Sequence, residues 1–166
     1  MLRNILMVLC LLSTTNSQAQ KHSKKDYKTI GKPLPQLKIV TLDGKTITNK
    51  DLNNKANLVV MLFNPICEHC QDETQLLESN IALFKQSKLL MITAPMMGSY
   101  LKTFVDNYHI SQYSKNIMIG LDSGSTINNL FTYEPLPQLN VYNAKRKLIK
   151  VFSGNTSIDS LKPYIQ

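Results

Sequence analysis

Two cysteines separated by two residues stand between an apolar stretch and an amphipathic stretch, and this arrangement limits the fold more than any other feature. Residues 57–64 are short and apolar, as in a strand that is buried on both faces. Residues 71–84 have the spacing of a helix. One face of this helix would hold Cys70, Thr74, Leu77, Ile81 and Phe84. The sequence therefore predicts a strand, the Cys67–Cys70 motif and a helix in direct succession.

The position of the motif predicts its chemistry. A helix N-terminus has free N–H groups and a partial positive charge, and both stabilise a thiolate. Cys67 stands at or just before the first turn, so its thiolate is expected to be stabilised most. We therefore expect Cys67 to act as the nucleophile. Cys70 lies one turn further on the same side, close enough to form a disulfide with Cys67. The direct interpretation is a reversible dithiol/disulfide couple.

Other uses of a CxxC motif fit less well. A structural zinc site needs a second pair of ligands, but after residue 70 the chain has no cysteine and His109 as its only histidine. The haem-attachment pattern CxxCH fails, because Gln71 follows Cys70. A static structural disulfide stays open as an alternative, and we expect no metal and no cofactor.

The first residues predict export. Residues 1–19 have the parts of a signal peptide: Arg3, an apolar run at 5–12 that is too short to span a bilayer, and a small residue, Ala19, before the cleavage point. An uncleaved anchor and lipidation at Cys10 are the alternatives. We expect the protein in the periplasm or cell envelope, where disulfides persist. Residues 20–29 are expected to form a flexible leader, and residues 30–166 a single domain.

The net charge is +8 and the pI is near 9.4, but the positive residues are scattered. Two short clusters, at 21–25 and 145–147, are the exceptions. No basic stripe alternates with aromatic residues, which argues against nucleic-acid binding. A basic surface instead favours acidic partners or the neighbourhood of a membrane.

The rest of the chain alternates strand and helix patterns. A second apolar run, 89–94, would pair in parallel with 57–64 through a βαβ unit. The other expected elements are an N-terminal hairpin at 37–48, a helix at 99–108, a short edge strand at 117–121, a short helix at 125–131 capped by Ser125, a hairpin at 138–152 and a final helix capped by Ser157. The fold class is therefore α/β, with a central mixed sheet flanked by helices and an N-terminal β-hairpin extension.

This arrangement resembles the thioredoxin-like superfamily, and within it the exported TlpA/ResA type of thiol-disulfide oxidoreductases. The resemblance covers residues 31–166. It rests on Gly31-Lys32-Pro33, Asp43-Gly44-Lys45, the strand–CxxC–helix unit, Glu73, and Leu136-Pro137 before a strand and hairpin. It implies a thioredoxin-like fold and a redox-active enzyme of the protein-disulfide reductase type.

Glu73 is the third candidate catalytic residue. It follows Cys70 by three residues and lies on the side of the helix that holds the apolar stripe. A partly buried carboxyl group there would have a raised pKa suited to moving a proton to or from a thiol. The resemblance implies that Glu73 tunes the two thiols. The alternative is a solvated glutamate near the helix start.

Four further residues are candidates for substrate binding. The resemblance implies a cis peptide bond at Leu136-Pro137, before the strand that faces the CxxC motif, and backbone groups of Leu136 that pair with a partner peptide. Glu68 and His69 form the spacer between the cysteines. A protonated His69 would make the pair more oxidising, and Glu68 would do the opposite.

The chain also departs from the family pattern. It has no tryptophan, although one often precedes the first cysteine, and Gln138 follows the predicted cis proline where threonine is frequent. These changes leave the reaction class in place. They leave open the substrate and the direction of electron flow.

The resemblance favours a monomeric reductant of disulfide-containing exported proteins, for example apocytochromes, that is itself reduced by a membrane thiol-reducing electron donor. A peroxiredoxin-like peroxidase is one alternative, but Val60 and Asn64 stand where its motif has proline and threonine or serine before the reactive cysteine. A copper carrier is another, with both cysteines and a third ligand such as His109 or Met96.

Overall fold

The structure is a computed structural model, and it describes residues 26–113, 115–130 and 135–166. The predicted signal peptide, Cys10 and the leader up to residue 25 lie outside the described residues. Within the described part of the chain, no helix is long and apolar enough to cross a membrane.

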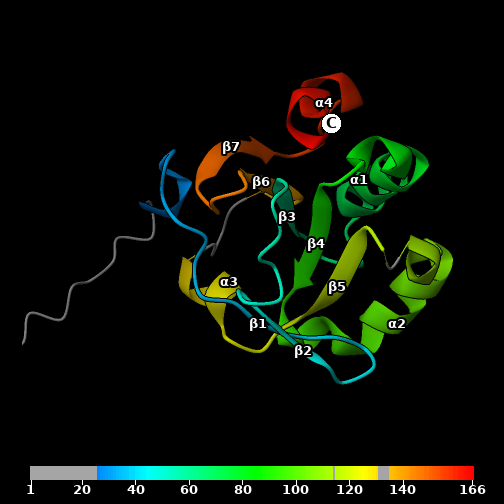
Figure 1. Cartoon of the computed structure of the whole chain (residues 1–166). Coiled ribbons are helices and arrows are strands. Elements are labelled where there is room, and N and C mark those ends of the chain that lie inside the picture. The colour runs from blue at the N-terminus through cyan, green and yellow to red at the C-terminus, as the bar shows by residue number, and fades with distance from the viewer. Residues whose placement is uncertain (1–25, 114, 131–134) are drawn as a thin grey trace, which may run out of the picture.

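Seven strands form one mixed sheet in the order β2-β1-β5-β4-β3-β6-β7 (Figure 1). Strands β3, β4 and β5 run parallel to one another, and all other neighbours pair antiparallel. The strands are β1 (Lys38–Val40), β2 (Thr46–Thr48), β3 (Leu58–Leu62), β4 (Lys88–Thr93), β5 (Ile117–Asp122), β6 (Gln138–Tyr142) and β7 (Leu148–Ser153). The predicted α/β class, with its mixed sheet and N-terminal hairpin, is confirmed.

The helices are distributed over both faces of this sheet. They are α1 (Glu68–Ser79), α2 (Gly98–Asn107), α3 (Thr126–Leu130) and α4 (Ile158–Ile165), with 3-10 turns at Asp26–Lys28, Ile81–Phe84, Pro95–Met97 and Ile110–Tyr113. Helices α1, α2 and α4 pack on one face (Figure 1). The opposite face is covered by α3, Leu52 and the segment before β1, including half-buried Tyr27.

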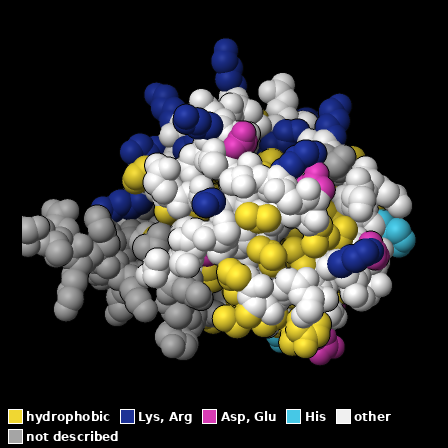
Figure 2. Space-filling model, turned by 90° about the horizontal axis from the view of Figure 1, so that it is seen from below, with side chains coloured by type: hydrophobic (Ala, Val, Ile, Leu, Met, Phe, Trp, Pro, Cys, Tyr) yellow, Lys and Arg dark blue, Asp and Glu magenta, His cyan; other side chains and the backbone are white. Residues whose placement is uncertain are grey.

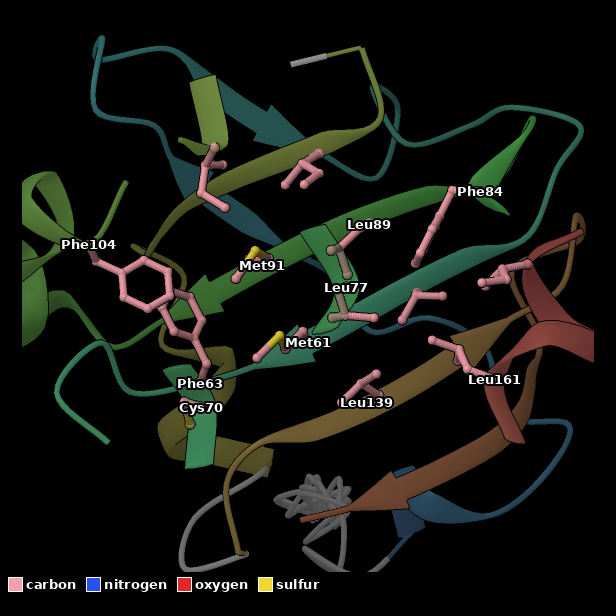
Figure 3. Close-up of a cluster of buried hydrophobic side chains, with 14 of the residues drawn as sticks. Met61, Phe63, Cys70, Leu77, Phe84, Leu89, Met91, Phe104, Leu139 and Leu161 are labelled. Atoms are coloured by element: carbon pink, nitrogen blue, oxygen red, sulfur yellow. The ribbon is translucent and has the colours of Figure 1, made fainter. Parts of the chain in front are cut away.

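Strand β3 lies at the centre of the molecule, and all five of its residues are buried. Val59 and Met61 face α1, α2 and α4, whereas Leu58, Val60 and Leu62 face the other side. Figure 3 shows the first of these clusters, with Met61 between the side chains of α1 and those of the neighbouring strands. Burial of each such side chain contributes about 1.5–3 kcal/mol, so the strand before the CxxC motif is held rigidly from both faces.

Helix α1 differs in extent from the prediction. It begins at Glu68 and includes Cys70, and it ends at Ser79 rather than near residue 84. Asn80 leaves the helical conformation, with φ −114° and ψ 16°, and its Nδ2 donates to the carbonyl of Leu76. The chain then continues as a 3-10 turn, in which Phe84 still reaches the core.

Two further expectations were wrong. The strand at 117–121 is not an edge strand, because β1 pairs with β5 through Ile39 opposite Asp122 and moves the edge out to β2. Ser125 does not cap α3, since its φ is +58° and it is Asp122 Oδ2 that accepts the N–H of Ile127. Ser157 does cap α4, where its hydroxyl accepts the N–H of Ser160.

Candidate active site

Cys67 occupies the N-cap position of α1, at the carboxyl end of β3. A turn at 64–67 joins the two elements, closed by a hydrogen bond of 3.1 Å from the Cys67 N–H to the Asn64 carbonyl. The Cys67 carbonyl then accepts the N–H groups of Cys70 and Gln71, both at 3.0 Å, which starts the helix. The Cys67 side chain is half-buried and is a free thiol. Its position at the helix start is the one that the sequence predicts.

Cys70 is fully enclosed. Its side chain is buried at the end of the apolar cluster, and Figure 3 shows it next to Phe63. The backbone N–H of Asn64 lies 3.4 Å from Cys70 Sγ. Burial raises the pKa of the Cys70 thiol to about 12, and the neighbouring Cys67 thiol adds to the rise. The pair therefore consists of one accessible thiol and one thiol that stays protonated at neutral pH.

Glu73 is buried beside this pair, with 1% of its surface exposed. Its Oε2 accepts the backbone N–H of Thr156 at 2.7 Å, while its Oε1 is buried without a hydrogen-bond partner. Burial raises the pKa of the Glu73 carboxyl, and the Thr156 N–H lowers it in part. The negative charge of Glu73 also raises the pKa of Cys70. The alternative of a solvated glutamate is thus wrong for this position.

The peptide bond Leu136-Pro137 is cis, as predicted. Pro137 is buried directly before β6, and its carbonyl accepts the N–H of Gly154 at 2.8 Å. Because Gln138 pairs with Leu62, the last residue of β3, the cis proline lies at the end of the sheet from which the CxxC turn leaves. Leu136 is half-buried.

The spacer residues Glu68 and His69 lie on the first turn of α1, where both are exposed. The predicted residues thus gather around one end of α1 and β3, and Leu136 adjoins them through Pro137. The backbone N–H of Thr156 belongs to this group as well. No local pattern in the sequence could have revealed it, because its partner Glu73 lies 83 positions away.

The copper-carrier alternative needs a third ligand beside the two cysteines. Among the residues that the structure describes, no group of three or more histidine, cysteine, aspartate or glutamate side chains is placed to hold a metal ion.

Two hollows open on the surface near α2. A groove of about 240 Å³ lies beside the CxxC turn, between the turn and α2. A larger, mainly apolar pocket of about 460 Å³ lies between the β1–β2 hairpin and α2, and neither cysteine lines it. Figure 2 views the molecule from below and shows hydrophobic side chains gathered near the middle of that face. The sequence predicted neither hollow.

The fold and the site define a class. A mixed sheet with a CxxC motif at the start of a helix, and a cis proline at the same end of the sheet, is a thioredoxin-like arrangement. A secreted disulfide oxidoreductase from Mycobacterium tuberculosis, described as homologous to E. coli DsbE, has a similar structure, with a TM-score of 0.64 and 18% identity over 78% of this chain and 94% of that one. StoA from Bacillus subtilis gives a TM-score of 0.60 and 17% identity, with 80% and 97% covered.

Named relatives narrow the resemblance further. No protein-family model matches the chain. A thiol-disulfide oxidoreductase ResA from Bacillus cereus is 23% identical over 98% of this chain and 91% of its own length. ResA from Bacillus subtilis is 25% identical, with 97% and 87% covered. The resemblance to TlpA/ResA-type thioredoxin-like proteins is confirmed, and these relatives support a redox enzyme of the protein-disulfide reductase type.

Proposed function

We propose that this protein is an exported thiol-disulfide oxidoreductase that reduces disulfides of other exported proteins through Cys67 and Cys70. One observation carries the proposal: a partly exposed thiol at a helix N-cap lies next to a buried thiol, and a buried carboxyl group lies close to the buried thiol. This is the arrangement that a two-step thiol exchange requires.

In the first step, the Cys67 thiolate attacks one sulfur of the partner disulfide. The Cys67–partner S–S bond forms as the partner S–S bond breaks, and the departing partner thiolate takes up a proton. Cys67 is the attacking residue because it is the accessible thiol of the pair and stands at the N-cap of α1.

In the second step, Cys70 loses its proton and attacks the Cys67 sulfur. The Cys67–Cys70 disulfide forms, the mixed disulfide breaks, and the second partner thiol is released, so that two electrons have passed from the pair to the partner. Because burial raises the pKa of Cys70 to about 12, this step needs a proton acceptor. Glu73 supplies it: its buried carboxylate has one oxygen without a partner and its own pKa is raised.

We assign the residues around Cys67 to the binding of the partner protein. Glu68 and His69 lie on the first turn of α1 and would contact the bound segment. Backbone groups of Leu136, next to the buried Pro137, would pair with it as an added strand. An external thiol donor in the membrane would reduce the Cys67–Cys70 disulfide again. The apolar run at 5–12 and the predicted cleavage after Ala19 support export.

The reduction potential tests this proposal. The predicted mature chain, from residue 20 onward, would be equilibrated with thiol buffers and its Cys67–Cys70 couple measured. A value of about −250 mV or lower indicates a reductant, whereas a value of about −120 mV indicates an oxidant and reverses the proposed direction. A protein without a reversible couple would not be an oxidoreductase at all.

Trapping tests the order of the two cysteines. Cys70→Ala removes the resolving thiol, so this variant is expected to accumulate a mixed disulfide with a reacted disulfide partner, detectable by mass. Cys67→Ala is the matched control and is expected to accumulate none, because its remaining thiol is buried. Accumulation on Cys67→Ala instead would assign the attack to Cys70.

A further inference from the structure

Five exposed lysines that are far apart in the sequence lie at one end of the sheet. They are Lys55, Lys85, Lys115, Lys145 and Lys147. Three of them precede the parallel strands β3, β4 and β5, whose amino ends lie at the same edge. The other two belong to the β6–β7 turn, which reaches this edge because Tyr142 pairs with Leu58, the first residue of β3. The fold thus assembles a basic surface, here called the lysine end, of which the sequence shows only the cluster at 145–147.

Contacts between the connecting segments bring these lysines near one another. Lys55 and Lys85 line one hollow of about 360 Å³ together with Gln166, at the chain end marked C in Figure 1. Lys88, half-buried at the start of β4, donates from its Nζ to the carbonyl of Lys115. The lysine end therefore extends across the starts of three parallel strands and the turn next to them, and not over a single pocket.

The charges of the lysine end are not neutralised by neighbouring carboxylates. Among the residues that the structure describes, the ion pairs lie elsewhere: Lys45 with Asp43, Lys102 with Asp106, and Lys162 with Asp159. Glu78, in the last turn of α1, is half-buried and accepts the Tyr113 hydroxyl. Asp51, in the loop before β3, accepts the N–H and the hydroxyl of Thr48. A carboxylate at the chain end would offset one of the five charges, so a net positive charge remains.

The opposite end of the sheet carries acidic side chains. Glu68 and Asp72 are exposed on the turns of α1 that follow Cys67, and this helix has no lysine or arginine. Strand β3 alone puts about 13 Å between the two ends, because successive residues of a strand rise about 3.3 Å. This exceeds the Debye length of about 8 Å at physiological ionic strength. The acidic end therefore has little influence on a partner that is bound at the lysine end.

We propose that the lysine end docks on a membrane surface that carries anionic phospholipids. The negative potential of such a surface attracts basic clusters of this size. A protein partner fits less well, because the cores of protein interfaces are rich in aromatic residues and arginine and poor in lysine. Here the exposed groups are lysines, and Arg146 is engaged by the carbonyls of Leu52 and Ala56. In this orientation Cys67 faces away from the membrane.

Binding to lipid vesicles tests the proposal. The protein used is the chain from residue 20 onward, which contains every described element and lacks the apolar run at 5–12, whose own affinity for lipid would mask the result. At low salt it is expected to bind vesicles of equal parts phosphatidylcholine and phosphatidylglycerol at least about tenfold more tightly than vesicles of phosphatidylcholine alone. This preference should disappear in about 1 M salt. Equal binding to both kinds of vesicle would overturn the proposal.

Two triple variants separate the lysine end from the net charge. One combines Lys85→Gln, Lys115→Gln and Lys145→Gln. The control combines Lys38→Gln, Lys50→Gln and Lys102→Gln, at exposed positions outside the lysine end. Both lose three charges and keep the basic leader, but only the first is expected to bind the anionic vesicles about tenfold more weakly than the unsubstituted chain. Equal losses in the two variants would mean that net charge alone attracts the protein, and the docking surface would be refuted.

Two further measurements test the orientation and the kind of partner. Cys67, the accessible thiol, should react with a large water-soluble maleimide at the same rate in free and vesicle-bound protein. A much slower reaction on vesicles would place the active-site end against the lipid and contradict the proposed orientation. Binding to soluble polyglutamate but not to anionic vesicles would assign the lysine end to an acidic protein instead. None of these measurements requires disulfide exchange, so their failure leaves the proposed function untouched.

Discussion

The backbone N–H of Thr156 donates a hydrogen bond of 2.7 Å to Glu73 Oε2, although the two residues are 83 positions apart in the chain. The bond ties the loop between β7 and α4 to the second turn of α1. It holds one carboxyl oxygen, while the other is buried without a hydrogen-bond partner. Glu73 is therefore fixed in place but keeps one oxygen for a proton.

Glu73→Gln is expected to slow the second step of the exchange by about 100-fold, because an amide cannot accept the Cys70 proton. The first step should change little. The measurement is the lifetime of the mixed disulfide in rapid-quench experiments. Glu78→Gln, which removes one charge from the same helix but from a half-buried position, is the control and should leave that lifetime unchanged. Equal lifetimes in wild type and Glu73→Gln would remove Glu73 from the mechanism.

The same variant has a second readout in stability. Burial raises the pKa of Glu73 above its ordinary value of 4.5, so the folded state binds this proton more tightly than the unfolded state. The corresponding stabilisation is complete below pH 4.5 and is lost as pH rises through the folded-state pKa. The free energy of unfolding of Glu73→Gln, minus that of the wild type, should therefore increase from about pH 4.5 upward. Urea titrations at several pH values would measure it.

Cys70 should control stability at the alkaline end. Its pKa rises from an ordinary value of 9.0 to about 12, so its contribution is complete below pH 9.0 and is lost between pH 9.0 and 12. Under reducing conditions, the wild type should lose up to about 1.4 kcal/mol per pH unit relative to Cys70→Ala across that range. Parallel unfolding curves for the two proteins above about pH 9 would show that Cys70 titrates normally.

Arg146 is predicted to be a structural residue. Its guanidinium donates to the carbonyls of Leu52, Ala56 and Asn143 and to the Asn54 side chain, and thereby joins the β6–β7 turn to the loop before β3. A lysine side chain cannot donate this set of hydrogen bonds. Arg146→Lys should therefore lower the free energy of unfolding by about 1–3 kcal/mol. Lys145→Ala, next to it but exposed, should stay within about 0.5 kcal/mol of the wild type.

Gly120 is predicted to be required for the docking of β1. A Cβ atom there would lie 2.6 Å from the Val40 carbonyl oxygen and 2.7 Å from Ile39 Cγ2. Gly120→Ala should therefore cost about 1–3 kcal/mol, measured by chemical denaturation. Gly98→Ala is the matched control, because the nearest atom to its Cβ is the flexible end of Leu121 at 3.4 Å. In α2 that change should be neutral or slightly stabilising.

The parts of the fold that depend on neighbouring residues could be predicted from the sequence. The apolar run of β3, the periodicity of α1 and the Ser157 cap are local signals, and each appears in the structure. The position of β5 was missed because it depends on a partner far away in the chain: the pairing of Ile39 with Asp122. Hydrophobic patterning identifies a strand but does not identify its neighbours.

The candidate site, too, could be predicted only where it depends on residues close together in the sequence. The spacing of Cys67, Cys70 and Glu73 on one helix was sufficient to place them together. The depth of burial of Cys70 and Glu73 was not visible, since it depends on Phe63, on α4 and on the loop at Thr156. The groove was missed because it forms between the CxxC turn and α2, two segments that meet only in the folded protein.

The β1–β2 hairpin also affects the tendency of this protein to aggregate. Strand β5 has six residues, and without β1 its outer backbone groups would be free to pair with another chain. With the hairpin in place, this side of the sheet ends at β2, a strand of only three residues that follows the charged turn with Asp43 and Lys45. So short an edge offers few hydrogen-bonding positions to a second sheet. The hairpin thus disfavours sheet-to-sheet aggregation through this edge of the sheet where many copies are crowded together.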